Sequence, residues 1–328
     1  MKISEVLKEK LTPNQLVEEI GNFVVNKLEP NKFIKPIPFT KIAKGKLKED
    51  AIFQLSDLHV GKVNKILNQD TRLLEETYNT SIMIQEANRC VEAIYSINDL
   101  LSAKYDVENI WILSQGDLLD NDRIFKGQQF FIDSDIGTQI WVGVQVLSDM
   151  INALLKVYKK VHFIGVIGNH GRMCIGREEA PVSSSFDYQL LRILQVMYKN
   201  NPRVEVVVPE TWDYIVDIKG WKYYIHHGDN VYSVASFPYY GISRQGKARR
   251  LEFDFDMELI GHFHTPMTIQ MSSKSCTMVN GGWIYHDSYA WKKFGALSTP
   301  VQNFFGTSEK RPKTWAFELD LKHEKKLK

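Results

Sequence analysis

The spacing of hydrophobic positions along the chain changes near residue 50. Before that point, ISEVLKEKL and TPNQLVEEIGNFVVNKL place apolar residues at helical spacing, and Thr12-Pro13 is a typical helix start. The next segment, NKFIKPIPFTKIAKGKLKED, is rich in lysine and proline, as linkers and extended arms are. We therefore expect residues 1–50 to form a small helical extension with a linker. Packing of this extension on the main body is favoured over a small DNA-binding helix-turn-helix.

From Ala51 onward, short apolar runs alternate with longer stretches of helical spacing. AIFQL, NIWILS, VHFIGVI and VEVVVP are predicted strands, whereas residues 71–105, 137–159 and 183–199 are predicted to be helical. This β-α-β-α order indicates right-handed crossovers and a largely parallel sheet with helices outside it.

After residue 209 the predicted strands follow one another with little helix between them. YIVDI and WKYYIHH, joined through Lys219-Gly220, predict a β-hairpin, and MELIG, CTMVN and TWAFELDL predict further strands. A second sheet is therefore expected to pack on the first, within one domain that covers residues 51–328. The basic tail KHEKKLK is expected to be solvated.

Composition restricts the class of protein. The 328 residues are 44% hydrophobic and 24% charged, which is typical of a globular protein with a large core. The formal net charge of +2 neither requires nor excludes a polyanionic partner. Three widely spaced cysteines indicate a reducing compartment, and the sequence predicts neither a signal peptide nor a membrane span. A cytoplasmic protein is expected, and its oligomeric state does not follow from the sequence.

Five predicted strands lead into polar residues of the same kind. In chain order these strand ends read SDLH (56–59), QGDLLD (115–120), GNH (168–170), HHGD (226–229) and GHFH (261–264). The loops at the carboxyl ends of strands in an α/β sheet gather at one edge, so we expect these side chains to lie together. A single motif of this kind is usually a turn, but five in succession are not. Imidazole, carboxylate and amide groups are ligands of Mn²⁺, Fe or Zn²⁺, and the absence of thiolates argues against a structural zinc site.

The ordered motifs D-x-H, G-D-x-x-D, G-N-H, H-G and G-H-x-H, between about Ala51 and Gly282, resemble those of the calcineurin-like metallophosphoesterases. Within that superfamily, the GDLLD form is most similar to the Mre11/SbcD-type DNA-repair exonucleases and their phage-encoded relatives. The resemblance implies a four-layer α/β/β/α sandwich of two mixed sheets flanked by helices. It also implies two divalent metal ions, with Mn²⁺ favoured over Fe, Zn²⁺, Mg²⁺ or Ni²⁺.

The resemblance further implies a role for each ligand. The first ion would be held by Asp57, His59 and His264, the second by Asn169, His227 and His262, and both would be bridged by Asp117. His226 competes with His227. Neighbouring strand residues point to opposite faces, so only one of the two can face the metals, and the position directly before the glycine favours His227.

Two metal ions ~4 Å apart can share a water, lower its pKa and neutralise a bound phosphate. The expected mechanism is in-line attack by a metal-bridging hydroxide, with His170 as the candidate that protonates the leaving oxygen. Asp120 is interpreted as a residue that orients His170, as a helix N-cap, or as both. Arg172 either binds phosphate or forms a surface ion pair. Gly171 departs from much of the family, which has Asp or Glu directly after the GNH histidine.

The substrate is expected to be DNA or RNA, because basic residues and aromatics are interleaved near the motifs, as in SRQGKARR and around Phe125. The alternative is a phosphatase or phosphodiesterase acting on phosphoproteins or cyclic or other nucleotides. Asn121 and Asp122 differ from the protein-phosphatase continuation GDxVDRG. A non-catalytic scaffold of the same fold is a remote alternative. His286 and Asp287 are expected to be structural or rim residues.

Overall fold

We analysed the fold in a computed structural model, which describes residues 13–34, 47–68, 70–173, 180–232, 238–272, 275–287, 291 and 299–322. Several sequence-based predictions lie outside these residues. They are the first helix of the extension, the Thr12 cap, most of the lysine-rich linker and the basic tail. No helix in the described part of the chain is long and apolar enough to cross a membrane.

A six-stranded sheet forms the first inner layer, in the order β13-β12-β1-β4-β5-β6. Its strands are β1 (Leu47–Leu55), β4 (Tyr105–Ser114), β5 (Lys160–Gly165), β6 (Val204–Val207), β12 (Val301–Thr307) and β13 (Ala316–Asp320). The run from β1 to β6 is parallel, as the alternating pattern predicted, and β12 and β13 extend the sheet as antiparallel strands.

The second sheet has five strands in the order β10-β11-β9-β8-β7. They are β7 (Asp213–Ile218), β8 (Trp221–His226), β9 (Met257–Ile260), β10 (Met267–Ser272) and β11 (Ser275–Val279). The two sheets face each other across a core in which Ile52 and Leu113 lie with Tyr223 and Leu259. The predicted hairpin is confirmed: β7 pairs with β8, and Lys219 and Gly220 between them have φ angles of 55° and 84°.

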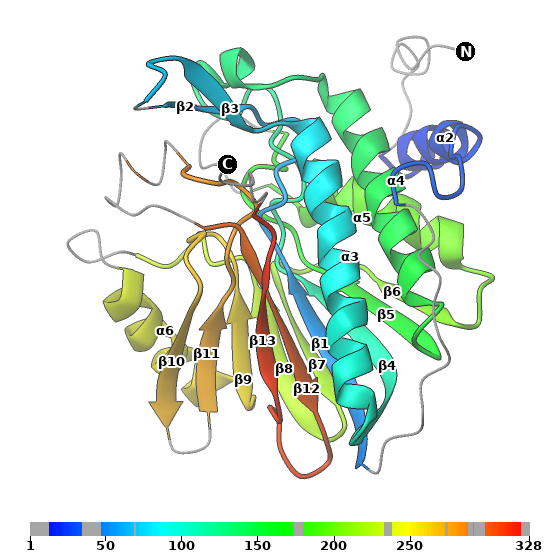
Figure 1. Cartoon of the computed structure of the whole chain (residues 1–328), viewed down its shortest axis with the longest axis vertical. Coiled ribbons are helices and arrows are strands. Elements are labelled where there is room, and N and C mark those ends of the chain that lie inside the picture. The colour runs from blue at the N-terminus through cyan, green and yellow to red at the C-terminus, as the bar shows by residue number, and fades with distance from the viewer. Residues whose placement is uncertain are drawn as a thin grey trace.

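Helices cover the outer faces of both sheets, which gives four layers (Figure 1). On the first sheet lie α3 (Thr80–Ser102), α4 (Ile136–Leu154) and α5 (Phe186–Tyr198), and on the second lies α6 (Pro238–Glu252). The described part of the N-terminal extension, which includes α2 (Pro13–Val25), packs on α5 and α4. Asp149 of α4 accepts the backbone N–H groups of Asn31, Phe33 and Ile34 at 3.1, 2.9 and 3.2 Å.

Three sequence-based predictions are wrong. Residues 71–78 do not begin a helix, because β2 (Asn64–Leu67) and β3 (Leu74–Tyr78) form a separate hairpin and Asn79 caps α3 by accepting the Ile82 N–H at 2.9 Å. TWAFELDL forms β13 of the first sheet, because it pairs with β12, which had not been predicted. Little helix was expected after residue 209, but SRQGKARR belongs to helix α6. A Cβ at Gly246 would lie 2.7 Å from Glu258 Oε2, so glycine permits close packing on the sheet.

Candidate metal centre

The loops after β1, β4, β5, β8 and β9 meet at one edge shared by both sheets. In the described part of the chain, three overlapping groups have ligand atoms within 4.8 Å of one another: Asp57, His59 and His264; His59, Asp117 and His170; and Asp117, His227 and His262. Asn169 joins the third group, with Oδ1 2.9 Å from Nε2 of His227. The structure therefore brings together all seven side chains that the sequence analysis selected as ligands.

The backbone of these loops is strained at the same residues. Left-handed φ angles occur at five of the seven: Asp57 (56°), His59 (45°), Asp117 (52°), His262 (69°) and His264 (53°). Such a conformation costs a non-glycine residue roughly 1–3 kcal/mol and persists where the surroundings fix it, most often at functional sites. The strain here turns each side chain from the strand end toward the centre.

His59 and His264 face each other through Nε2 atoms that are 3.2 Å apart. Nδ1 of His59 lies 3.1 Å from Asp120 Oδ1, and Nδ1 of His264 lies 3.3 Å from Asp287 Oδ2. When both imidazoles are neutral, each carboxylate accepts a hydrogen bond from Nδ1–H, and both Nε2 atoms present lone pairs. Oδ1 of Asp57, 3.3 Å from Nε2 of His264, adds a third acceptor. Either a proton on one Nε2 or a metal cation between these atoms removes the repulsion between the lone pairs.

The second group has the same character. Nδ1–H of His227 donates to the Gln115 carbonyl at 2.7 Å, which directs Nε2 toward the centre. Nε2 of His227 lies 3.1 Å from Asp117 Oδ2 and 3.1 Å from Nδ1 of His262. His226, one residue earlier, points to the opposite face of the sheet, where its Nε2 lies 3.0 Å from Glu258.

The electrostatics of the centre favour positive charge. Burial alone would lower the pKa of His227, but the neighbouring Asp117 carboxylate outweighs it and raises this pKa to about 10. Burial is likewise outweighed at His264, where Asp57 and Asp287 raise the pKa to about 10. The buried carboxylates therefore draw in positive charge, either as protons or as metal ions.

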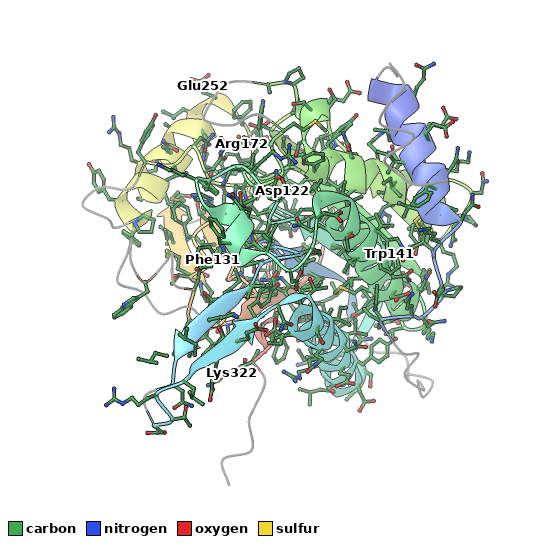
Figure 2. All side chains as sticks on the ribbon, turned by 90° about the horizontal axis from the view of Figure 1, so that it is seen from above. Asp122, Phe131, Trp141, Arg172, Glu252 and Lys322 are labelled. Atoms are coloured by element: carbon green, nitrogen blue, oxygen red, sulfur yellow. The ribbon has the colours of Figure 1, made fainter. Side chains whose placement is uncertain are left out.

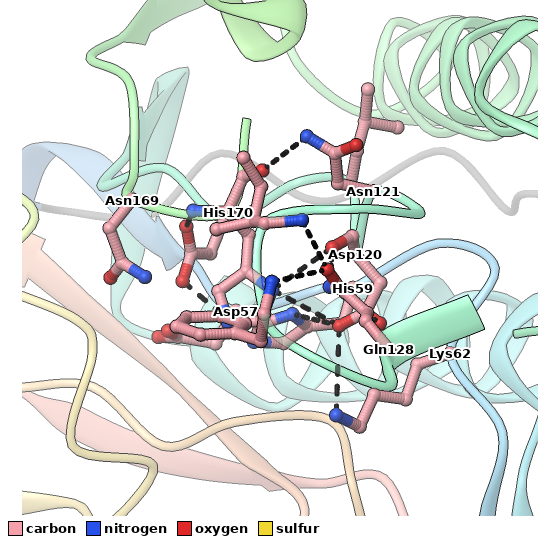
Figure 3. A network of polar contacts seen from close by, with 12 residues as sticks. Asp57, His59, Lys62, Asp120, Asn121, Gln128, Asn169 and His170 are labelled. Atoms are coloured by element: carbon pink, nitrogen blue, oxygen red, sulfur yellow. Dashed lines mark hydrogen bonds and ion pairs between the residues drawn. The ribbon is translucent and has the colours of Figure 1, made fainter. Parts of the chain in front are cut away.

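Asp120 connects His59, His170 and Lys62 (Figure 3). Its Oδ1 lies 3.1 Å from Nδ1 of His59, 3.2 Å from Nδ1 of His170 and 3.7 Å from Nζ of Lys62. Burial lowers the pKa of His170, but Asp117 and Asp120 outweigh it and raise this pKa above its ordinary value. The helix N-cap interpretation of Asp120 is wrong: its carboxylate is turned inward by the two imidazoles, and the next helix, η1 (Gln128–Phe131), begins after Gly127.

Arg172 contacts its own loop, since Nε donates to the Asn169 carbonyl at 2.8 Å, and it forms no ion pair with the described residues. The space beside Gly171 is filled, because a Cβ there would lie 2.5 Å from Ser185 Oγ and 2.9 Å from Cγ of Asp187. Position 171 therefore has no carboxylate of its own, and the Asp187 carboxylate of α5 lies beside it.

Asp187 is a supporting residue that the sequence analysis missed. Its buried carboxylate accepts the backbone N–H groups of Asp117 and Gly168, both at 3.0 Å, and of Leu119 at 3.3 Å. Burial, followed by the charge of Asp117, raises its pKa to about 6. Asp187 thus joins the loops after β4 and β5. Gly171, which stands where much of the family that the motifs resemble has Asp or Glu, was the available signal.

Asp287 was expected to be structural or to lie at the rim. It is buried and fixes Nδ1 of His264, so it supports the centre directly. Gln128 was also missed: its Nε2 donates to Asp120 Oδ2 at 3.3 Å. Neither residue belongs to a strand-end motif, and the sequence offered no signal for Gln128.

Comparisons with known proteins add resemblances in fold. No family model matches the chain, and no curated protein matches it. Vacuolar protein sorting 29 from Cryptosporidium parvum is 13% identical, with a TM-score of 0.35 over 79% of this chain and 86% of that one. A metallophosphoesterase from Sphaerobacter thermophilus is 16% identical, with a TM-score of 0.34 over 78% and 83%. A predicted phosphoesterase from Streptococcus pneumoniae is 10% identical, with a TM-score of 0.33 over 82% and 97%. No activity follows from such values, so the functional conclusion rests on the side chains.

Proposed function

We propose that this chain is a dinuclear-metal-dependent phosphodiesterase of the calcineurin-like type that acts on DNA or RNA. One observation carries the proposal: Nε2 of His59 and Nε2 of His264 lie 3.2 Å apart while the Nδ1 atom of each is paired with a carboxylate. These two nitrogens require either a proton, which the raised pKa of His264 favours, or a metal cation that takes its place. A second acceptor group around His227 lies next to it and shares Asp117.

Two divalent cations in these groups would neutralise the charge of a bound phosphate and activate a water for in-line attack. Asp57, His59 and His264 would hold one ion, and Asn169, His227 and His262 the other, with Asp117 between them. A set of imidazoles, carboxylates and one amide oxygen, without thiolates, suits Mn²⁺, with Fe, Zn²⁺, Mg²⁺ or Ni²⁺ as alternatives.

His170 would supply the proton for the leaving group. As the bond from water oxygen to phosphorus forms, the bond from phosphorus to the leaving oxygen breaks, and that oxygen requires a proton. Nδ1 of His170 is held by Asp120, at 3.2 Å from Oδ1 and 3.0 Å from the carbonyl, so Nε2 is left to donate. Asp120 is thus a positioning residue for His170.

The surroundings of the centre support a nucleic-acid substrate. Exposed Lys126 lies in the loop that follows Asp120, with Arg123, whose Nε is 2.8 Å from Asp122 Oδ1, and Lys62 lies 3.7 Å from Asp120. Positive side chains at these positions would attract a polyanionic backbone. Aromatic side chains on the same loop offer surfaces for bases.

Hydrolysis of bis(p-nitrophenyl) phosphate in the presence of Mn²⁺ tests this proposal. We expect turnover, and His170→Ala should lower kcat by about 10²-fold or more while the bound metal is retained. His162→Ala, at the far end of β5, serves as the control and should keep full activity. Cleavage of monoesters alone would exclude a phosphodiesterase in favour of a phosphatase. Absence of turnover with every divalent ion tried would favour a non-catalytic scaffold.

A panel of single-stranded DNA, duplex DNA, RNA and cyclic nucleotides then defines the substrate. We expect cleavage of at least one polymer at a higher kcat/KM than any cyclic nucleotide. Hydrolysis confined to cyclic nucleotides would contradict the nucleic-acid part of the proposal and leave the metal-dependent chemistry intact.

A further inference from the structure

The segment from Asn121 to Phe131, here named the aromatic loop, exposes three phenylalanines beside the candidate centre. Phe125, Phe130 and Phe131 have exposed fractions of 44%, 78% and 60%. Seen from above, Phe131 and Asp122 lie around the middle of the molecule, over the edge where the strands end (Figure 2). Large apolar side chains exposed together mark a binding surface more often than a chance arrangement.

Hydrogen bonds tie the aromatic loop to the catalytic residues. Gln128 Oε1 accepts the backbone N–H groups of Ile124 and Phe125 at 2.8 and 3.1 Å, and its Nε2 donates to Asp120 Oδ2 at 3.3 Å. The Phe131 carbonyl accepts the N–H of Val63 at 2.7 Å. The backbone that carries the exposed rings is therefore held next to Asp120, the residue that positions His170.

Phe125 lies against His170 itself. Their ring centroids are 5.0 Å apart with an interplanar angle of 59°, and Phe125 remains 44% exposed while the His170 side chain is only 14% exposed. Because His170 is the proton donor to the leaving oxygen, Phe125 stands on the leaving-group side of the scissile bond. Exposed Lys126 follows it in sequence and supplies positive charge for an adjoining phosphate, whereas Arg123 is paired with Asp122.

We propose that Phe125 stacks on the base of the nucleoside that departs from the scissile phosphate, so that the substrate is a single strand or an unpaired end. This inference rests on the proposed function and deepens it. A base within a duplex has both faces covered by its neighbours and cannot offer one to Phe125. Stacking of one base on an aromatic side chain corresponds to about a 5-fold to 150-fold gain in affinity.

Binding of two labelled strands of equal length, an oligothymidylate and an abasic tetrahydrofuran strand, tests the inference by fluorescence anisotropy. The measurement uses the chain with Ca²⁺ in place of Mn²⁺, which we expect to bind the strands without cleaving them. We expect the oligothymidylate to bind at least 5-fold more tightly than the abasic strand. Phe125→Ala should lower this preference at least 5-fold, and Phe125→Trp should retain it. Phe253→Ala is the matched control, because Phe253 is also 44% exposed and stacks on Tyr224 near the start of β9, away from the centre.

An unchanged preference in Phe125→Ala would overturn the inference. Equal weakening of both strands is such a result, and it would mean that Phe125 supports the loop without stacking on a base. Cleavage by the wild-type chain with Mn²⁺ is measured separately. If the chain cleaves but its preference for the oligothymidylate does not depend on Phe125, only the stacking surface is rejected. If that preference depends on Phe125 but no ester is cleaved, the proposed catalysis is rejected and the stacking surface is kept.

Discussion

At the scale of single residues, the centre depends on which nitrogen of each histidine points inward. Nδ1–H of His227 is held by the Gln115 carbonyl, and Nδ1 of His264 is held by Asp287. The spacing of motifs at strand ends was sufficient to predict which side chains gather. It could not predict the groups that orient them, because one is a backbone carbonyl and another comes from a distant segment.

The neighbours His226 and His227 provide a direct comparison at this scale. His227→Ala should remove at least one of two bound ions per chain, because it deletes an acceptor that faces Asp117. His226→Ala should keep both ions but lose about 1–3 kcal/mol of stability, because Glu258 and Arg249 lose a buried partner. Metal content by mass spectrometry and urea unfolding measure the two effects. Equal metal content in both variants would contradict the assigned orientation.

At the scale of elements, two helices each fix distant backbone through one buried carboxylate. Asp187 in the first turn of α5 supports the centre, and Asp149 of α4 binds the N-terminal extension. Asp187 accepts three backbone N–H groups in the loops after β4 and β5. Asp149 accepts three from the N-terminal extension. Helical spacing predicted both helices, but it could not identify these carboxylates, because their partners are backbone groups far away in the sequence.

Asp187→Ala and Asp149→Ala separate support of the centre from stability. Each should cost about 1–3 kcal/mol or more, because buried N–H donors lose their acceptor. Only Asp187→Ala should also weaken Mn²⁺ binding, by about 10-fold or more, since it frees the loop that carries Asp117. Calorimetric titration with Mn²⁺ and thermal unfolding provide the two readouts. Comparable loss of Mn²⁺ affinity in both variants would mean that Asp187 acts through overall stability.

Glu86 on α3 makes stability depend on pH. Burial raises its pKa from 4.5 to about 9, so the folded state binds a proton that the unfolded state releases above pH 4.5. The protonated Glu86 side chain therefore makes its full contribution to the free energy of unfolding below pH 4.5, and this contribution is lost as the pH rises toward 9. Glu86→Gln should gain about 1–3 kcal/mol at pH 8 and little at pH 5, as measured by urea unfolding. Glu92→Gln, at an exposed position of the same helix, should show no such difference. A pH-independent effect of Glu86→Gln would contradict this account.

At the scale of the whole molecule, the hydrophobic pattern predicted two packed sheets with outer helices, and the structure has this layering. The pattern missed β12, which carries Gln302 and Asn303 in the core. Gln302 Oε1 accepts the Ser56 N–H at 3.0 Å, and Asn303 Nδ2 donates to Gln54 Oε1 at 3.0 Å. Gln302 and Asn303 are polar although they are buried, so the pattern of hydrophobic positions alone could not identify β12 as a strand.

The candidate centre joins the two sheets, because its ligands follow three strands of one sheet and two of the other. Bound Mn²⁺ should therefore stabilise the entire fold, by about 2.7 kcal/mol at a concentration 100 times its dissociation constant. Thermal unfolding in Mn²⁺ and in EDTA measures this difference. Asp117→Asn should lose most of the shift, and an equal shift in that variant would place the stabilising ion elsewhere.

The most direct measurement of the central claim is anomalous diffraction from crystals grown with Mn²⁺, recorded on both sides of the manganese absorption edge. We predict two anomalous peaks about 4 Å apart, one among Asp57, His59 and His264 and one among Asn169, His227 and His262, with Asp117 between them. A single peak would contradict the dinuclear centre. Crystals with Mn²⁺ peaks only at other places on the molecule would contradict the metal site altogether.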